Sequence, residues 1–122
     1  GDVFMLRGSH SIFADELDTA LLERHHQQDI SVCASLYGAG RSLMSADAAE
    51  IEQRVFAENS EIIDCLQRND SRLQMRPLRV AAEAFSYDHD PAAGLLRLEL
   101  SLPTGCYVTT MLAHFLLLDD AS

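Results

Sequence analysis

The sequence predicts an α+β fold in which small strands and helices are followed by a β-hairpin and a C-terminal helix. Apolar residues recur at helical spacing in the first 75 residues, whereas they alternate with polar residues in two stretches of the last third. Glycine and proline separate these stretches. The chain has 122 residues, 48% of them apolar, so it can bury the core of one domain or of pieces of two.

Two short strands and a helix are expected at the start of the chain. The strands cover residues 3–7 and 11–13, and a Gly-Ser pair between them provides the turn. Asp15 is positioned to cap a helix over residues 16–28, because an aspartate oxygen accepts hydrogen bonds from the free N–H groups of a first turn. The core-facing positions of this helix recur every three or four residues, at Leu17, Ala20, Leu21 and His25.

A further strand and two helices follow. The strand covers residues 30–34 and ends before a Gly-Ala-Gly turn. Ser45 is a good N-cap for a helix over residues 46–58. A second helix restarts over residues 59–66, and a short basic turn then runs to Pro77. The buried stripe of the helix after Ser45 is expected at Ile51, Val55 and Phe56.

The last third reads as a hairpin followed by a helix. Residues 84–89 and 95–102 alternate as half-buried strands do, and the Asp-Pro-Ala-Ala-Gly segment between them suits a loop. A Pro-Thr-Gly turn then precedes a helix over residues 106–118. The inward side of the second strand is expected to carry Leu96, Leu98, Leu100 and Leu102, and that of the first Phe85, Tyr87 and His89. The helix is expected to bury Val108, Met111, Leu112, Phe115 and Leu116.

The pattern of the chain changes near Arg76-Pro77. A residue before proline avoids the helical region, so a helix continuing from the first part must end there. We therefore expect two structural units, residues 1–75 and residues 76–122.

The charge of the chain is strongly acidic, with a formal net charge of −10 from 19 acids and nine bases. All nine bases are arginines, and lysine is absent. Because phosphate contacts come mostly from lysine and arginine, this balance argues against a stand-alone RNA-binding module. It permits an acidic body with one basic patch.

Such a patch is formed by four arginines within twelve residues. Their offsets of 0, 4, 8 and 11 place them along one helical face, if the helix lasts that long. One interpretation is a solvated helix face with local ion pairs to Glu61, Asp64 and Asp70, and the other is a stripe that contacts RNA phosphates. The four residues are Arg68, Arg72, Arg76 and Arg79.

Several kinds of site are disfavoured. The three cysteines are scattered and odd in number, which is atypical of a disulfide framework or a zinc site and favours a reducing cytoplasm. His25 and His26 are adjacent, and neighbours on a helix point about 100° apart, so they do not form a zinc-binding pair. No G-x-S-x-G elbow, phosphate-binding loop, secretion signal or membrane span is found. We expect neither a cofactor nor a metal.

The segment from Leu102 to Thr110 combines a strand end, a Pro/Gly turn and a helix start. Unpaired N–H groups at a helix start favour anions such as phosphate. An aromatic side chain there, Tyr107, can stack on a base taken out of its helix. The alternative is an ordinary joint in which Tyr107 packs locally.

This segment resembles the C-terminal motif of the TruD family of tRNA pseudouridine synthases, roughly Leu-Pro-x-Gly-Ser-(Phe/Tyr)-Ala-Thr. Cys106 replaces the usual serine and Val108 the usual alanine, and the family's later Arg-Glu is Ala113-His114 here, which puts a polar role of that turn in doubt. The matching positions are Leu102, Pro103, Gly105, Tyr107 and Thr109.

The resemblance extends upstream in order. Residues 85–89 look like the family's Leu-Ser-Trp-x-Trp strand. Residues 1–6, 12–13, 30–40 and 46–75 look like parts of the domain that this family inserts into its catalytic fold.

The resemblance implies an enzyme that isomerises a uridine of tRNA, uridine 13, to pseudouridine without a cofactor. The family's catalytic aspartate lies in a Gly-x-Lys-Asp motif, which a chain without lysine cannot contain. We therefore expect no catalytic residue here and no activity of this chain alone. Tyr107 matches the aromatic beside the target base, Gly105 permits the turn, and Thr109 helps to start the helix. Residues 1–75 then belong to the inserted domain and residues 76–122 to the catalytic domain.

The expected partners are tRNA, through the full-length enzyme, and the N-terminal catalytic segment. We also expect exposed apolar surface that could lead to self-association. The main alternative is a non-catalytic RNA- or protein-binding module derived from this fold. A self-contained small enzyme that uses its own acids is the third interpretation.

Overall fold

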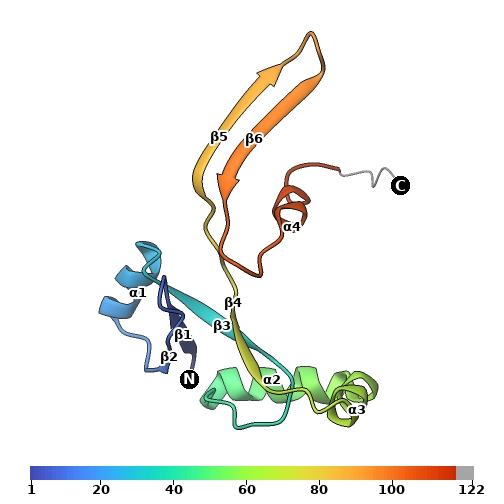
Figure 1. Cartoon of the computed structure of the whole chain (residues 1–122). Helices are drawn as coiled ribbons and strands as arrows, with labels where there is room; N and C mark the ends of the chain where they lie inside the picture. Colours follow the sequence, from blue (N-terminus) through green and yellow to red (C-terminus); the bar gives the residue numbers. More distant parts are fainter. Residues whose placement is uncertain (118–122) are drawn as a thin grey trace. The chain divides into compact units, whose positions relative to one another are not determined.

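The structure, a computed structural model, describes residues 1–117 and confirms the α+β class (Figure 1). The chain divides into two compact units, Gly1–Arg79 and a second that begins at Val80. Within the described residues, the first unit holds a four-stranded sheet with three helices, and the second holds a two-stranded hairpin with one helix. The division lies just beyond the expected seam, because Pro77 still pairs with Cys33 in the first sheet.

The sheet of the first unit is antiparallel, with strand order β2-β1-β3-β4. Its first three strands confirm those expected from the sequence. The fourth was missed and lies where the sequence suggested only a basic turn. The bounds are Val3–Leu6 for β1, Ile12–Ala14 for β2, Ile30–Leu36 for β3 and Gln74–Pro77 for β4.

A small apolar core lies on one face of this sheet. Phe4 and Ile30 are almost completely buried, and Leu21 of α1 (Thr19–His26) packs with them. The ring of Phe4 stacks on that of Phe13, with ring centroids 5.6 Å apart. Because side chains of a strand alternate between faces, the same face also presents Leu6 and Val32.

Helix α1 begins later than expected. Asp18, not Asp15, is its N-cap, and the Asp18 carboxylate accepts a hydrogen bond from the Leu21 N–H at 2.7 Å. Asp15 instead accepts one from the adjacent Glu16 N–H at 2.8 Å. Leu17 therefore precedes the helix and is 61% exposed, so its expected place on the buried stripe was wrong.

The bounds of α2 (Ala46–Glu58) are those predicted, and α3 (Ser60–Arg68) also confirms a predicted helix. Ser45 occupies the N-cap position of α2, although its side chain makes no capping hydrogen bond. The expected buried stripe was wrong, because Ile51 and Val55 are about half exposed.

Polar and aromatic contacts attach the α2–α3 pair to the end of β3. Tyr37 packs edge-on against Phe56 of α2, with centroids 4.9 Å apart, and its hydroxyl accepts a hydrogen bond from the Gln67 side chain of α3 at 2.6 Å. The Glu52 carboxylate of α2 accepts hydrogen bonds from the hydroxyls of Ser35 and Ser42. These contacts fix the helices without burying their apolar residues.

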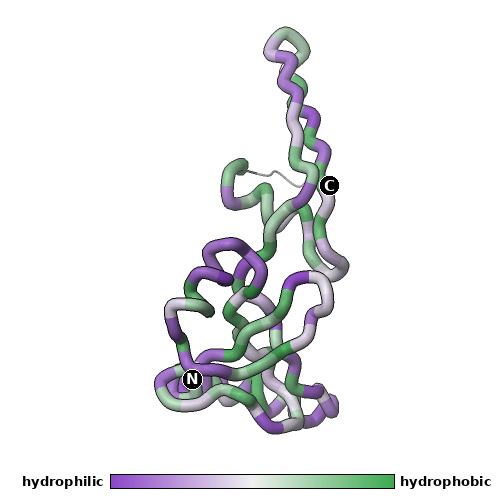
Figure 2. Tube along the Cα trace, turned by 90° about the vertical axis from the view of Figure 1, so that its left-hand side faces the viewer, coloured by the Kyte–Doolittle hydropathy of each residue, from purple (hydrophilic) through white to green (hydrophobic). Residues whose placement is uncertain are grey.

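The second unit contains the predicted hairpin, formed by β5 (Glu83–Asp90) and β6 (Leu95–Ser101). The Asp90 carboxylate accepts hydrogen bonds from the N–H groups of Ala92 and Ala93, at 3.0 and 3.1 Å, and so holds the connecting loop. Hydropathy alternates along both strands (Figure 2). The alternation read from the sequence is thus present in the fold.

Helix α4 is shorter than expected. It covers Val108–Leu112, whereas residues 106–118 were predicted, and Leu118 lies outside the described residues. Three β-branched residues at its start lower helix propensity. After Leu112 the chain forms tighter turns, in which the Phe115 N–H donates to the Leu112 carbonyl at 2.9 Å. Phe115, expected to be buried, is 76% exposed.

Candidate nucleic-acid interface

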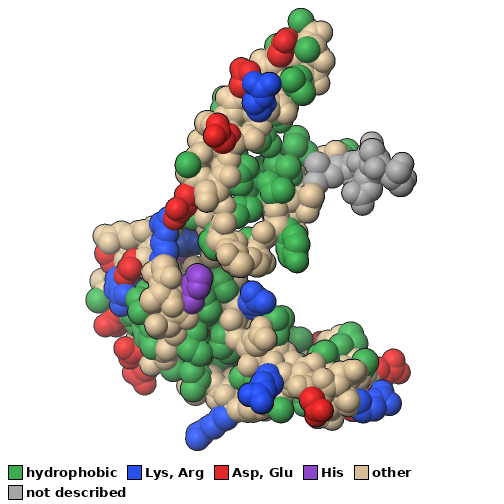
Figure 3. All heavy atoms as spheres, viewed as in Figure 1, with side chains coloured by type: hydrophobic (Ala, Val, Ile, Leu, Met, Phe, Trp, Pro, Cys, Tyr) green, Lys and Arg blue, Asp and Glu red, His purple; other side chains and the backbone are tan. Residues whose placement is uncertain are grey.

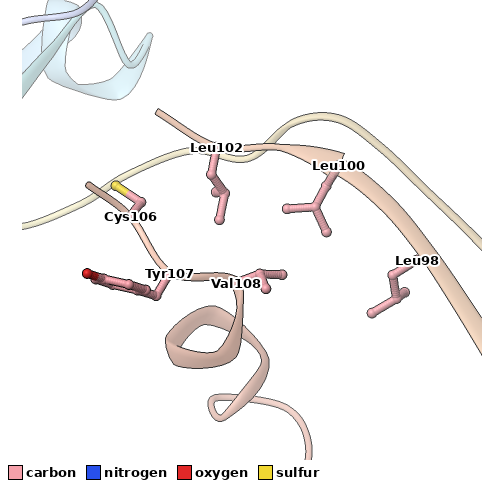
Figure 4. Close-up of a pocket in the computed structure, with 6 residues that line it drawn as sticks. All are labelled: Leu98, Leu100, Leu102, Cys106, Tyr107 and Val108. Atoms are coloured by element: carbon pink, nitrogen blue, oxygen red, sulfur yellow. The ribbon is translucent and has the colours of Figure 1, made fainter. Parts of the chain in front are cut away.

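An open hollow of about 480 Å³ lies in the second unit, between the end of the hairpin and the start of α4 (Figure 4). The side chains of Leu100 and Leu102 point toward Val108, and the ring of Tyr107 points away from them. The hollow is therefore apolar inside, with an aromatic ring at its edge. Its lining residues are Leu98, Leu100, Leu102, Cys106, Tyr107 and Val108.

The turn that forms this hollow depends on glycine. The Cys106 N–H donates to the Pro103 carbonyl at 3.1 Å and closes the turn. Gly105 adopts a φ of +88°, which a residue with a Cβ atom rarely tolerates. The sequence suggested this role of Gly105, and the backbone conformation agrees with it.

Tyr107 is the N-cap residue of α4 and has an extended backbone. Its carbonyl accepts a hydrogen bond from the Met111 N–H at 3.3 Å, so the backbone of Tyr107 is tied to the helix. Its side chain is nevertheless 73% exposed, which rules out the alternative that the ring packs locally. A ring held at its base and free on its faces can stack on a nucleobase.

Thr109 lies in the first turn of α4 and is exposed. This helix has only five residues, so the expected attraction of phosphate to the helix start has little basis here. The chemistry available at this site is therefore stacking and apolar contact.

The four arginines of the expected patch do not share a helical face, which corrects the expectation from their spacing. Arg68 ends α3, and its Nε donates to the backbone carbonyl of Asp64 at 3.2 Å, not to the expected carboxylate. Arg79 follows β4, and its Nη2 donates to the His25 carbonyl at 2.8 Å. Helix α3 ends at Arg68, so the spacing of Arg72 and Arg76 from Arg68 no longer places them on one helical face.

Two of these arginines do share one side of an extended segment. The backbone of Arg72 forms an isolated β-bridge with that of Ala39, and Arg76 of β4 pairs with Ala34 of β3. Every second residue of this segment is exposed, and the exposed ones include both arginines. Four residues of extended chain span roughly 13 Å, so the guanidinium groups can contact separate phosphates of one RNA strand.

The cysteines and histidines offer no comparable site. Within residues 1–117, no three His, Cys, Asp or Glu side chains are grouped to hold a metal ion. Burial raises the pKa of the Cys33 thiol, which makes this thiol a poor nucleophile. Over the same residues, no helix has the length and apolar character that a bilayer crossing requires.

Sequence reasoning placed Tyr107, Gly105 and Thr109 at this site but did not anticipate the hollow beside them. Its leucine wall could have been inferred, because the alternation of β6 already placed Leu98, Leu100 and Leu102 on one side. The inclusion of Cys106 and Val108 depends on the turn geometry, which no sequence pattern specified.

Comparison with known proteins gives matches along almost the whole chain. The chain is 33% identical to tRNA pseudouridine synthase D of Colwellia psychrerythraea over 98% of its length. It is 36% identical to the protein of the same name from Aeromonas salmonicida over 99% of its length, and 37% identical to that of Psychrobacter arcticus over 93%. The chain matches a segment of the TruD family. No family model matches the sequence.

The matched segment is about a third of each TruD relative. It spans 35% of the Colwellia protein, 34% of the Aeromonas protein and 30% of the Psychrobacter protein. The resemblance read from the motif around Tyr107 is thus confirmed over almost the whole chain, for a segment of a TruD protein.

Proposed function

We propose that this chain is part of an enzyme that isomerises uridine to pseudouridine in tRNA. The resemblance to the TruD family implies that the modified position is uridine 13 and that the enzyme acts in the cytoplasm. The observation that carries the proposal is the similarity to tRNA pseudouridine synthase D over 92–99% of the chain. The reaction needs no cofactor, because the uracil is detached from the sugar and rejoined through carbon.

The proposed role of this chain is to form one wall of the active site. Tyr107 would stack beside the flipped uracil, a role supported by its 73% exposed ring and its position at the edge of an apolar hollow. Gly105 would set the turn that presents this ring, and Thr109, in the first turn of α4, would help to start the supporting helix. An apolar wall also excludes water from the detached base.

The catalytic aspartate is proposed to come from another part of the polypeptide. No lysine occurs among these 122 residues, so the family's Gly-x-Lys-Asp motif does not lie within them. The 122 residues alone should therefore be inactive. We assign residues 1–75 to the inserted TruD domain and residues 76–122 to the catalytic domain.

The four arginines of the expected patch are proposed to contact tRNA phosphates. Arg72 and Arg76 are the best placed, because both lie exposed on one side of an extended segment. Arg68 and Arg79 each hold a backbone carbonyl, so they would contribute less.

A chimera tests the proposed function. In the Aeromonas salmonicida relative, the matched segment would be replaced by residues 1–122, and pseudouridine formation in an unmodified tRNA transcript would be measured by base-specific chemical mapping. We expect an active chimera and an inactive isolated chain. A folded chimera that forms no pseudouridine would overturn the enzyme proposal.

The acidic balance of the chain supports a second candidate, a non-catalytic binding module. Salt-sensitive tRNA binding by the isolated chain, combined with an inactive chimera, would favour this candidate. An active chimera would exclude it.

A further inference from the structure

One face of the sheet in the first unit is covered at one end and open at the other. Ile30, at the start of β3, is completely buried in the core that α1 covers, and Val32 packs against that core. Alternate residues of a strand share a face, so Leu36 lies on the same face further along, where it is 50% exposed. Helix α2 leaves this end open, because its contact with β3 is made to Ser35, which belongs to the opposite face.

Three polar side chains border this open end. Gln74 lies opposite Leu36 and Arg76 lies opposite Ala34, and directly opposite residues of an antiparallel pair share a face. Arg72 precedes Gln74 by two residues in the same extended segment. Arg72, Gln74 and Arg76 are exposed, and within residues 1–117 their side chains make no hydrogen bond or ion pair. The open sheet face is defined here as Ala34, Leu36, Arg72, Gln74 and Arg76.

The charge of this region differs from that of the chain as a whole. In Figure 3, basic side chains lie over the first unit where β4 runs, and acidic side chains lie to either side. Two arginines without acidic partners give a local positive potential on a chain with a net charge of −10. The open sheet face therefore suits an anionic ligand.

The order of groups on the open sheet face favours a nucleic-acid strand over an acidic peptide. A nucleic-acid strand alternates anionic phosphates with flat bases whose faces are apolar. The face alternates in the same way, because an apolar floor at Leu36 and an amide at Gln74 lie between the two guanidinium groups. An acidic peptide would match the arginines but not the floor between them.

The spacing places one nucleoside over this floor. Gln74 is separated from each arginine by two residues of extended chain, roughly 7 Å. A base between two contacted phosphates can rest on Leu36, while the Gln74 amide offers its edge a donor and an acceptor. In a double helix both the faces and the pairing edge of a base are occupied, so an unpaired nucleotide fits better.

We propose that the open sheet face binds an unpaired nucleotide of the RNA substrate and that Gln74 is the contact that distinguishes it from a paired one. The inference rests on the proposed function for its ligand, RNA. It extends the phosphate contacts of Arg72 and Arg76 to a site that recognises a base.

Binding of single-stranded and duplex RNA tests this site. A labelled RNA oligonucleotide of mixed sequence, alone or annealed to its complement, would be titrated at low salt with the 122-residue chain and followed by fluorescence anisotropy. We expect tighter binding of the single strand. Gln74→Met keeps the length of the side chain but removes the amide, and should weaken single-strand binding by about fivefold or more. Gln53→Met, on α2, is the matched control and should bind like the wild type.

A second pair of variants tests the apolar floor. Leu36→Ala should weaken single-strand binding, whereas Leu43→Ala, at a residue that is 45% exposed and lies outside the strands, should not. Gln74→Met and Leu36→Ala should leave the slope of log affinity against log salt unchanged, because neither removes a phosphate contact. Local unfolding of β4 would lower this slope as well, so the slope separates a direct contact from a structural effect.

Equal affinity for the single strand and the duplex, or no binding of either, would overturn the proposal. So would equal effects of the test and control variants. A glutamate-rich peptide that displaces the labelled strand better than unlabelled RNA would assign the open sheet face to an acidic protein instead.

The two proposals fail in different ways. Single-strand binding that depends on Gln74, combined with an inactive chimera, counts against the enzymatic function and supports the nucleotide site. An active chimera, combined with equal binding of single-stranded and duplex RNA, overturns the nucleotide site alone.

Discussion

At the scale of single residues, Tyr107 and Gly38 are constrained in opposite ways. Tyr107 has a backbone tied to α4 and a free ring, so its side chain is available for a ligand. Gly38 has no room for any side chain, since an added Cβ would lie 2.0 Å from the Arg72 carbonyl carbon. The first residue bears on the proposed function and the second on stability.

Replacement of Tyr107 should separate stacking from hydrogen bonding. In the active chimera, Tyr107→Ala should lower kcat/KM by about 5- to 150-fold, because stacking of a base on an aromatic ring contributes about 1–3 kcal/mol. Tyr107→Phe keeps the ring and should retain most of the activity. Steady-state kinetics on a tRNA transcript measure both, and full activity of the alanine variant would contradict the stacking role.

Replacement of Gly38 should destabilise the first unit by steric overlap. Gly38→Ala is expected to lower the free energy of unfolding by roughly 1–3 kcal/mol or more, as overpacking does. Gly8→Ala is the control for backbone strain alone, because Gly8 has a φ of +86° but nothing within 4 Å of an added Cβ. The control should cost roughly 1–2 kcal/mol. Urea unfolding followed by circular dichroism compares them, and a smaller loss for Gly38→Ala would argue against the close approach.

At the scale of secondary-structure elements, β4 shows most clearly what the sequence concealed. It has four residues, ends in proline and carries Arg76, and the spacing of the neighbouring arginines imitates a helix. Its pairing partner, β3, precedes it by 38 residues at the contact between Leu36 and Gln74, which no local pattern reveals. Elements with strong local signals were predictable, as the Ser45 N-cap and the bounds of α2 illustrate.

The site was predictable to a similar degree. The motif around Tyr107 indicated the turn and its glycine, because Pro103 and Gly105 have strong backbone preferences. The length of α4 was not predictable from apolar spacing, since Val108, Thr109 and Thr110 oppose helix formation while Met111 and Leu112 favour it.

The extended segment around β4 should govern the salt dependence of tRNA binding. Arg72→Gln together with Arg76→Gln should reduce the slope of log affinity against log salt by roughly 1.4–1.8, because each phosphate contact contributes about 0.7–0.9. Arg54→Gln, on α2, is the matched control and should leave the slope unchanged. Gel-shift titration at several salt concentrations measures this slope. An unaltered slope in the double variant would show that Arg72 and Arg76 do not contact phosphates.

At the scale of the whole molecule, burial is concentrated in the first unit. All six residues buried in the described part of the chain belong to it: Val3, Phe4, Leu21, Ile30, Cys33 and Gly38. Among its described residues, the second unit has strands and a helix but no buried side chain. The two units should therefore differ in their ability to fold alone.

Separate expression of the two units tests this difference. A chain of residues 1–79 should unfold cooperatively in urea, whereas residues 80–122 should show weak strand signal and no cooperative transition. The reason is that a two-stranded hairpin with one short helix buries too little apolar surface to offset chain entropy. Circular dichroism during denaturation distinguishes them, and a cooperative transition in residues 80–122 would refute the expectation.

The β-bridge between Ala39 and Arg72 brings together the two ends of the segment that contains α2 and α3. The Ala39 N–H donates to the Ser71 carbonyl at 2.7 Å, and the Leu73 N–H donates to the Ala39 carbonyl at 3.2 Å. The helical pair thus leaves and rejoins the sheet at one point, like an insertion in a hairpin turn. A longer, shorter or exchanged segment between Ala39 and Arg72 should therefore leave the pairing of β3 with β4 in place, since loop length has only a logarithmic effect on the entropy of closure.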